Sequence, residues 1–128
     1  MSDRLPRAVL LVSPDLLAAT RLAGLAETAG AKLETIASPM ARPRGSTFDL
    51  VLLDLQGLPA DPAAAVGRCR VLAAGDPPSR AVPVIAFGPH VWHERLAAAM
   101  AAGADAAVSR GELLGTFADL VQRWAGGS

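Results

Sequence analysis

Three side chains that could take part in chemistry stand at the ends of short apolar runs. Asp54 ends one run, Ser13 follows another, and Arg110 lies two residues beyond a third. If the runs are neighbouring parallel strands, these side chains meet at the carboxyl edge of the sheet, where open parallel sheets bind their ligands. A carboxylate there is costly to bury unless hydrogen bonds or a cation offset its charge, and a guanidinium can pair with it. The sequence therefore predicts one polar site centred on Asp54.

Other reactive residues are sparse. His90 and His93 have the spacing of a metal-binding pair, but no third ligand is close in sequence, so we interpret them as solvated polar residues. Cys69 is the only cysteine, which excludes an intramolecular disulfide, and it is predicted to be a small helix residue. The glycines do not form a phosphate-binding spacing, so nucleotide binding has no support.

The elements that would position the polar site alternate along the chain. Apolar runs at 8–12, 50–53 and 82–87 are typical of strands covered on both faces, with a weaker edge strand at 31–36 and a short strand at 106–108. Helices are expected to about residue 29, within 62–74, over 91–102 and over 112–124. This alternation predicts an α/β, flavodoxin-like (βα)5 three-layer sandwich with a parallel sheet in the order 2-1-3-4-5.

Local signals refine two of the connections. Ser13, Pro14 and Asp15 have the signature of a helix start, with the serine as N-cap, the proline at the first helical position and the acid in the first turn. The helix is predicted to stop at Gly30. The segment 37–47 contains two prolines and a glycine, so the second helix of the fold is expected to be shortened or missing.

The bulk properties limit the class of protein. With 128 residues, the chain fits one domain over 1–128 with a core of about 7–125, and no output domain is expected. Twelve Lys and Arg residues balance twelve Asp and Glu residues, so nucleic acid and acidic membranes are not expected partners. The first apolar run is too short for a leader or a membrane span, and the single cysteine is consistent with a reducing compartment. We expect a cytoplasmic protein.

Three stretches of the sequence carry a family resemblance. They are FDLVLLDLQGLP at 48–59, VPVIAFG at 82–88 and AAGADAAVSR at 101–110. In this order and spacing they resemble the receiver domain of bacterial response regulators, the CheY-like superfamily. The resemblance implies two-component signalling, with Asp54 at the position that accepts a phosphoryl group.

The resemblance also implies a magnesium site, and here the sequence departs from it. The acidic pair after the first strand corresponds to Ser13 and Pro14, and neither can be an anionic ligand. Asp15 is the candidate substitute acid, but it is displaced by at least one position from the acidic pair. Asp54 and the backbone carbonyl of Gln56 remain as ligands, which make a poor site for Mg²⁺. We expect weak metal affinity and no cofactor.

Two further family positions differ. The switch Ser or Thr after the fourth strand corresponds to Gly88, so no hydroxyl is available there, and the lysine after the fifth strand corresponds to Arg110. Without a metal, Arg110 is predicted to pair with Asp54 and to keep the pocket closed and inert.

These departures favour an atypical receiver, or pseudo-receiver, that is not an enzyme and acts through protein contacts without phosphorylation. The alternative is a functional phosphoacceptor modified on Asp54 by a histidine kinase, and a more distant one is a flavodoxin-like protein that binds a small molecule. The expected partner is a histidine kinase or a separate output protein.

The expected interaction face, which is also a candidate homodimer face, combines the segments 91–102, 106–108 and 112–124. Trp92 is either an anchor for a partner or a packing residue. The candidate residues on this face are Trp92, Arg95, Asp105, Asp119 and Arg123.

Overall fold

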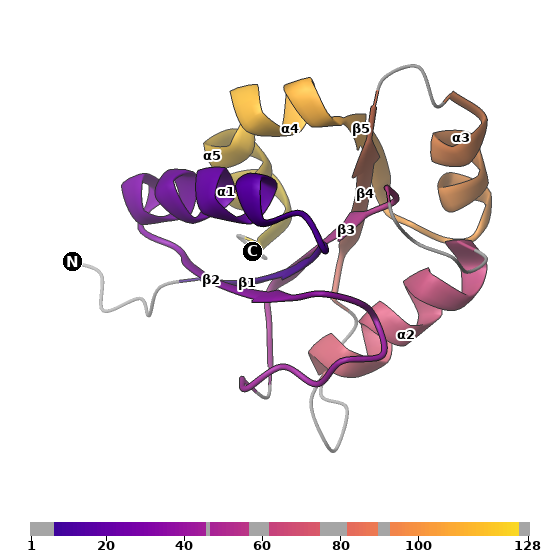
Figure 1. The fold of residues 1–128 in the computed structure, drawn as a ribbon, viewed down its shortest axis with the longest axis horizontal. Coiled ribbons are helices and arrows are strands. Elements are labelled where there is room, and N and C mark those ends of the chain that lie inside the picture. The colour runs from indigo at the N-terminus through magenta and orange to yellow at the C-terminus, as the bar shows by residue number, and fades with distance from the viewer. Residues whose placement is uncertain (1–6, 46, 57–61, 75–81, 90–92, 126–128) are drawn as a thin grey trace.

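A five-stranded parallel sheet forms the centre of the molecule (Figure 1). The computed structural model describes residues 7–45, 47–56, 62–74, 82–89 and 93–125. The sheet has the order β2-β1-β3-β4-β5, and each neighbouring pair is parallel. The strands are β1 (Ala8–Val12), β2 (Lys32–Ile36), β3 (Leu50–Asp54), β4 (Val84–Gly88) and β5 (Ala106–Ser109). The predicted fold class and strand order are confirmed.

Helices cover both faces of the sheet. They are α1 (Leu16–Ala29), α2 (Pro62–Ala74), α3 (His93–Ala101), α4 (Arg110–Gly115) and α5 (Phe117–Leu120), followed by a π-helical turn (Val121–Ala125). Figure 1 shows α1, α4 and α5 on one side of the sheet, with α2 and α3 on the other. Among the described residues, no helix combines the length and the apolar character needed to cross a membrane.

The strands supply side chains to both sides because successive residues of a strand point to opposite faces. In β1, Val9 and Leu11 pack with α1, α4 and α5, whereas Leu10 and Val12 pack with α2 and α3. All five residues of β3 and of β4 are buried. This double coverage explains why these strands are continuous apolar runs. β2 is only partly buried, which agrees with its predicted place at the edge.

The described residues between β2 and β3, 37–45 and 47–49, form a loop without a helix, which confirms the prediction that the second helix of the fold is shortened or missing. The carboxylate of Glu34 accepts hydrogen bonds from the backbone N–H groups of Arg44 and Gly45 and so fixes the end of this loop. Nε of Arg68 on α2 donates to the carbonyl of Pro39 at 3.2 Å. The loop is thus held to β2 at one point and to α2 at another.

The start of α1 differs from the prediction. Asp15, and not Ser13, is the N-cap: its Oδ1 accepts hydrogen bonds from the backbone N–H groups of Leu17 at 2.9 Å and Ala18 at 3.2 Å. The helix begins at Leu16, so the placement of Pro14 at the first helical position was wrong. Aspartate and serine cap helices equally well, and the hydroxyl of Ser13 is engaged elsewhere. The predicted end of the helix at Gly30 is confirmed, with φ of 74°.

The C-terminal helix predicted over 112–124 is interrupted. α4 ends at Gly115, and the backbone N–H and the hydroxyl of Thr116 both bond to the carbonyl of Glu112, at 2.9 and 2.7 Å. Glycine and threonine are both weak helix formers, so this pair is a natural breaking point. The apolar stripe is nevertheless kept: Leu113, Phe117, Leu120 and Val121 are buried, and Trp124 packs against them.

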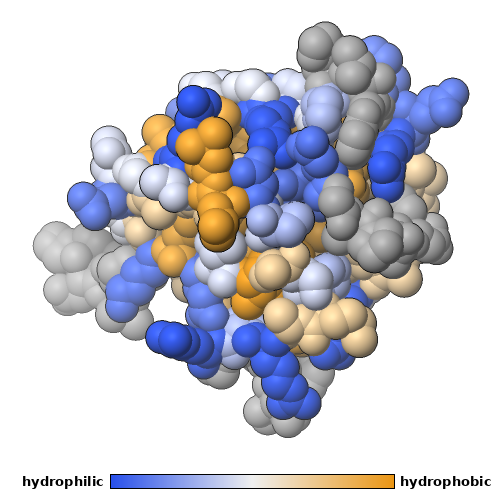
Figure 2. Space-filling view, in the orientation of Figure 1, coloured by the Kyte–Doolittle hydropathy of each residue, from blue (hydrophilic) through white to orange (hydrophobic). Residues whose placement is uncertain are grey.

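Large apolar side chains are also exposed at a few places on the described surface, where Figure 2 shows hydrophobic residues among hydrophilic ones. Single exposed residues of this kind are common, but neighbouring ones mark contact surfaces. The exposed large apolar residues are Leu16, Leu17, Met40, Val71 and Met100.

Candidate functional site

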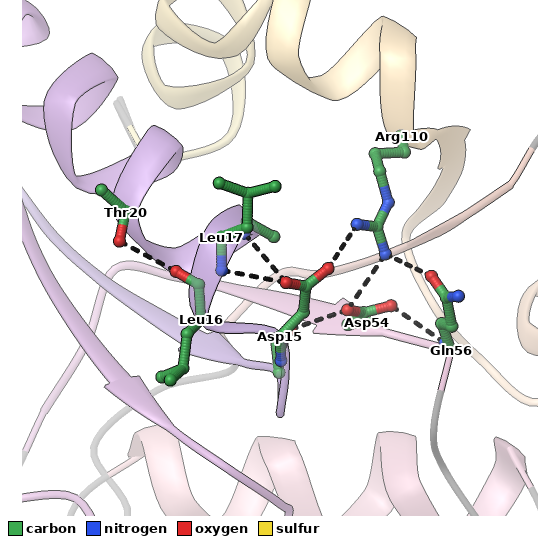
Figure 3. A network of polar contacts seen from close by, with 9 residues as sticks. Asp15, Leu16, Leu17, Thr20, Asp54, Gln56 and Arg110 are labelled. Carbon is green, nitrogen blue, oxygen red and sulfur yellow. Dashed lines mark hydrogen bonds and ion pairs between the residues drawn. The ribbon is translucent and has the colours of Figure 1, made fainter.

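The predicted polar site lies at the carboxyl edge of the sheet (Figure 3). Asp54, which Figure 3 labels, is the last residue of β3. Ser13 follows β1 directly. Asp15 caps α1, and Arg110 is the first residue of α4, directly after β5. The structure therefore brings together side chains that are far apart in the sequence, because neighbouring parallel strands end at the same edge.

Asp54 is fully buried, and its carboxylate accepts hydrogen bonds from three groups. The hydroxyl of Ser13 donates to Oδ2 at 2.7 Å, and the backbone N–H of Gln56 donates to Oδ1 at 2.9 Å. Nη2 of Arg110 lies 3.4 Å from Oδ2. Burial raises the pKa of Asp54 above its ordinary value, whereas the bonds from Ser13 and Gln56 and the charge of Arg110 act in the opposite direction.

Arg110 joins the two aspartates. Its Nη1 forms an ion pair with Oδ2 of Asp15 at 2.8 Å, and its Nη2 donates to Oε1 of Gln56 at 2.5 Å as well as approaching Asp54. The guanidinium also lies 5.9 Å from the centre of the Phe87 ring. The predicted contact with Asp54 is present, but it is a single contact and not a bidentate pair. The shorter ion pair to Asp15 was not predicted.

Asp15 has two separate tasks. Its Oδ1 caps α1, and its Oδ2 faces Arg110. The hydrogen bond from Arg110 is the main reason why the pKa of Asp15 lies below its ordinary value, and the bonds from the start of α1 add to it. Asp15 therefore serves as an anionic partner of the guanidinium.

Of the three groups that donate to Asp54, Ser13 makes the shortest hydrogen bond, at 2.7 Å. It is buried, its hydroxyl donates to Asp54, and the same oxygen accepts the backbone N–H of Asp15 at 3.1 Å. Pro14 is exposed and takes no part in these contacts. Gly88 is the last residue of β4 and pairs with Ser109 of β5. Because glycine has no side chain, position 88 offers no hydroxyl to the site. At Ser13, sequence reasoning noted the missing acid but not the hydrogen bond that replaces it.

The side-chain oxygens that could bind a magnesium ion at this site are engaged with Arg110. Mg²⁺ needs several oxygen ligands around one point, with carboxylates that are free to bind it. Here the carboxylates of Asp15 and Asp54 and the side-chain carbonyl of Gln56 all face the guanidinium of Arg110. Within the described part of the chain, no group of three or more His, Cys, Asp or Glu side chains could hold a metal. The cationic charge at this edge comes from the chain itself.

The other candidate residues lie elsewhere. Trp92 and His90 fall outside the described residues, and His93 is an exposed residue at the start of α3. Cys69 is a helix residue of α2, as predicted, and it is fully buried, which raises the pKa of its thiol to about 12. A thiol of this kind is almost wholly protonated near neutral pH and is a poor nucleophile.

The residues of the expected interaction face are in different settings. Oδ2 of Asp105 accepts the backbone N–H of Val84 at 2.8 Å and pairs with Arg70 at 3.1 Å, so this carboxylate holds the fold together. Arg95 on α3 is partly buried, and it is engaged in an interaction within the protein. Asp119 and Arg123 are exposed near the end of the chain. The use of this face in binding stays a prediction.

Comparisons with known proteins agree with this architecture at the level of the fold. The sequence matches no protein-family model and no curated protein. Solved structures do match. The receiver domain of the sensor histidine kinase PA1611 from Pseudomonas aeruginosa, which was solved with magnesium in its active-site cleft, is 20% identical and superimposes with a TM-score of 0.65 over 95% of this chain and 99% of that one.

The chain has the fold of a receiver domain. The chemotaxis response regulator CheY4 of Vibrio cholerae is 18% identical, with a TM-score of 0.69 over 92% of this chain and 98% of that one. A two-component response regulator of Clostridium difficile is 13% identical, with a TM-score of 0.71 over 94% and 97%. Receiver folds thus match almost the whole chain, whereas the polar site has to be judged on its own residues.

Sequence reasoning named Asp15 and Gln56 but missed the contacts that both make with Arg110 through their side chains. A usable signal was present for Gln56, which lies two residues beyond the strand-ending Asp54. For Asp15, the signal was an acid within reach of the carboxyl end of the first strand.

Proposed function

We propose that this chain is a receiver-fold module of two-component signalling that acts through protein contacts and does not take up a phosphoryl group. The single observation that carries the proposal is the guanidinium of Arg110, which lies against Asp15, Asp54 and Gln56. Phosphoryl transfer to a carboxylate needs a divalent cation to offset the charge of the transferring group. The oxygens that would bind the cation face a side chain that is always charged.

The state of Asp54 supports the same conclusion. Its Oδ2 accepts the hydroxyl of Ser13 and faces Arg110, and its Oδ1 accepts the backbone N–H of Gln56. Attack on a phosphoryl donor would require one of these oxygens to leave its partners inside a buried site. The position of Gly88 offers no hydroxyl to bind the incoming group.

The proposed module has no enzymatic activity of its own and works in the cytoplasm. Its partner is a histidine kinase or a separate output protein, because signalling by contact requires a second molecule. Homodimerisation through α3, β5, α4 and α5 belongs to the same proposal. The competing function is a phosphoacceptor modified on Asp54, which retains its place at the end of β3.

Phosphorylation with a small donor tests the proposal directly. The full chain is incubated with acetyl phosphate and Mg²⁺, and the intact mass is measured beside that of Asp54→Asn. We expect no phosphate adduct in the wild type. An adduct that disappears in Asp54→Asn would overturn the proposal in favour of the phosphoacceptor.

A second variant provides the positive control. Ser13→Asp combined with Arg110→Lys restores an acid and a lysine at the positions that the receiver resemblance assigns to them. We expect this double variant to bind Mn²⁺ in an electron paramagnetic resonance titration, whereas the wild type does not. Equal Mn²⁺ binding by both proteins would show that Arg110 does not exclude a metal ion.

A further inference from the structure

The outward face of α2 is apolar along its length. Ala63, Ala64, Gly67 and Val71 are exposed, and Val71 has 64% of its surface accessible. The opposite face packs on the sheet through buried residues such as Cys69. A surface helix normally carries polar residues on its outward face, and a helix that is apolar on all sides is normally covered. The outward face of α2 therefore has the composition of a contact surface.

The arginines of α2 lie beside this face and are held by neighbouring segments. Arg68 donates to the carbonyl of Pro39 in the loop before β3. Arg70 donates to the carbonyl of Val82 at 2.9 Å and pairs with Asp105 at 3.1 Å. The two side chains thus fix α2 between its neighbours, and the centre of the outward face is left without a charge.

The loop that Arg68 holds against α2 extends this surface and adds positive charge. Met40 is 77% exposed, and the side chains of Arg42 and Arg44 are exposed beside it. Segments 37–45 and 62–74 together contain four arginines and no acidic residue, although the whole chain has equal numbers of cations and anions. Arg70 is paired with Asp105, and the carboxylate of Glu34 accepts the backbone N–H groups of Arg44 and Gly45, so the positive charge of this surface comes from the side chains of Arg42 and Arg44. Figure 2 shows pale hydrophobic residues where Figure 1 draws α2, with hydrophilic side chains around them.

We propose that the α2 surface, defined as the outward face of α2 (Ala63, Ala64, Gly67, Val71) together with Met40, Arg42 and Arg44, binds an acidic amphipathic helix of a partner protein. Apolar side chains of that helix would cover Val71 and Met40, and its carboxylates would lie near the two arginines. Apart from the adjoining residues and backbone of α2 itself, no atom lies within 4 Å of a Cβ placed on Gly67, so a partner backbone can come close at this point.

Charge decides against a second copy of this chain as the occupant. A twofold contact places the same patch on both subunits, so Arg42 and Arg44 would face the arginines of the other copy. The resulting repulsion opposes a symmetric dimer, whereas an acidic helix complements the patch. This inference does not depend on whether Asp54 is phosphorylated, since the α2 surface shares no residue with the polar site.

The probe is a synthetic peptide of about 18 residues, long enough to form a helix, with leucines at every third or fourth position and glutamates elsewhere. The ¹⁵N-labelled full chain is titrated with it, and amide shifts are followed by NMR. We expect shifts at 40–45 and 63–71. Shifts confined to the polar site or to α1 would overturn the proposal, as would equal affinity for a peptide with lysine in place of every glutamate.

Matched substitutions distinguish specific peptide binding at the α2 surface from nonspecific binding elsewhere. Val71→Ser and the double variant Arg42→Glu/Arg44→Glu should each weaken binding at least about fivefold. Leu16→Ser replaces an exposed apolar side chain of α1, Arg21→Glu reverses one exposed charge there, and both should leave the affinity unchanged. An equal loss in the α1 variants, or no loss in the α2 surface variants, would refute the assignment.

Gly67→Gln distinguishes binding from folding. Glutamine is a better helix former than glycine, and the site has room for a side chain, so the melting temperature should rise. The same side chain should obstruct close approach and weaken peptide binding. Unchanged binding would contradict the proposed docking geometry.

Sedimentation tests whether a second copy of the chain occupies the α2 surface instead. Self-association of the wild type that Val71→Ser abolishes would show that it does and would overturn the proposal.

Discussion

The hydroxyl of Ser13 donates a 2.7 Å hydrogen bond to Oδ2 of Asp54, which lies 41 positions further along the chain, and both side chains are buried. An acid in place of Ser13 would put a second negative charge beside this carboxylate. The two carboxylates would repel each other unless a metal ion between them offset their charges. A hydroxyl is neutral and supplies its own proton. The exchange of one residue type therefore turns a position suited to a metal ligand into one that satisfies Asp54 without a metal.

Ser13→Ala should destabilise the protein by about 1–3 kcal/mol, because it removes a hydrogen bond from a buried carboxylate and leaves no solvent to replace it. Urea unfolding measures the change. Thr20→Ala is the matched control: its hydroxyl bonds to the carbonyl of Leu16 on the exposed side of α1, and its loss should have a much smaller effect. Equal effects in the two variants would argue against a special role for Ser13.

Arg110→Ala should cost about 1–3 kcal/mol, less than the loss of one partner from a fully buried pair, because 26% of the Arg110 side chain is exposed. The penalty arises because Asp54 loses the guanidinium that faces its Oδ2. Adding Asp54→Asn should therefore recover part of the stability, which a double-mutant cycle by chemical unfolding measures. Additive losses would mean that Arg110 acts through Asp15 alone.

The two aspartates of the site should give stability opposite dependences on pH. Burial raises the pKa of Asp54 above 3.8, so its contribution is fully present below that pH and is lost as the pH rises through the raised pKa. Arg110 lowers the pKa of Asp15, so its contribution is present above 3.8 and is lost as the pH falls through the lowered pKa.

Two variants separate these contributions. Relative to the wild type, Asp54→Asn should gain stability as the pH rises above 3.8, whereas Asp15→Asn should lose stability as the pH rises towards 3.8 and stay less stable above it. Unfolding free energies at a series of pH values give the comparison. Carboxyl carbon NMR shifts provide an independent check, since Asp54 should titrate at a higher pH than Asp15. The reverse order of titration would contradict the assignment of the two environments.

Two glycine-to-alanine substitutions should have effects of opposite sign. Gly30 ends α1 with φ of 74°, where a side chain is strained, so Gly30→Ala should destabilise by about 1–2 kcal/mol. Gly67 lies inside α2 with open space around it, so Gly67→Ala should stabilise by about 0.5–1 kcal/mol. Thermal unfolding of both variants tests the pair, and a loss of stability at Gly67 would mean that the outward face of α2 is already in contact with something.

Much of the fold could be predicted because its signals are local. Buried parallel strands are continuous apolar runs, and the prolines of 37–47 exclude a regular helix from that connection. The break at Thr116 was missed because the apolar stripe continues across it, from Leu113 to Phe117 and beyond. Periodicity alone cannot distinguish an interrupted helix from a straight one.

The site was predicted less completely because its contacts join distant parts of the chain. Arg110 and Asp54 are 56 positions apart, and Arg110 and Asp15 are 95 apart. The sequence places all three residues at one edge of the sheet, but the choice between two carboxylates depends on the direction of each side chain. The N-cap was misassigned for a similar reason. Serine and aspartate cap helices about equally well, and only the hydrogen bond from the Ser13 hydroxyl to Asp54 leaves Asp15 as the cap.

The contacts of Arg70 affect how the protein unfolds locally. Its guanidinium reaches the carbonyls of Val82 and Gly103 and the carboxylate of Asp105, so a single side chain of α2 holds the segments that lead into β4 and β5. Separating any of these segments exposes the others, and we expect this half of the sheet to open as one cooperative unit. Native-state hydrogen exchange should then give α2, β4 and β5 a common opening free energy, and Arg70→Ala should lower it for all three together.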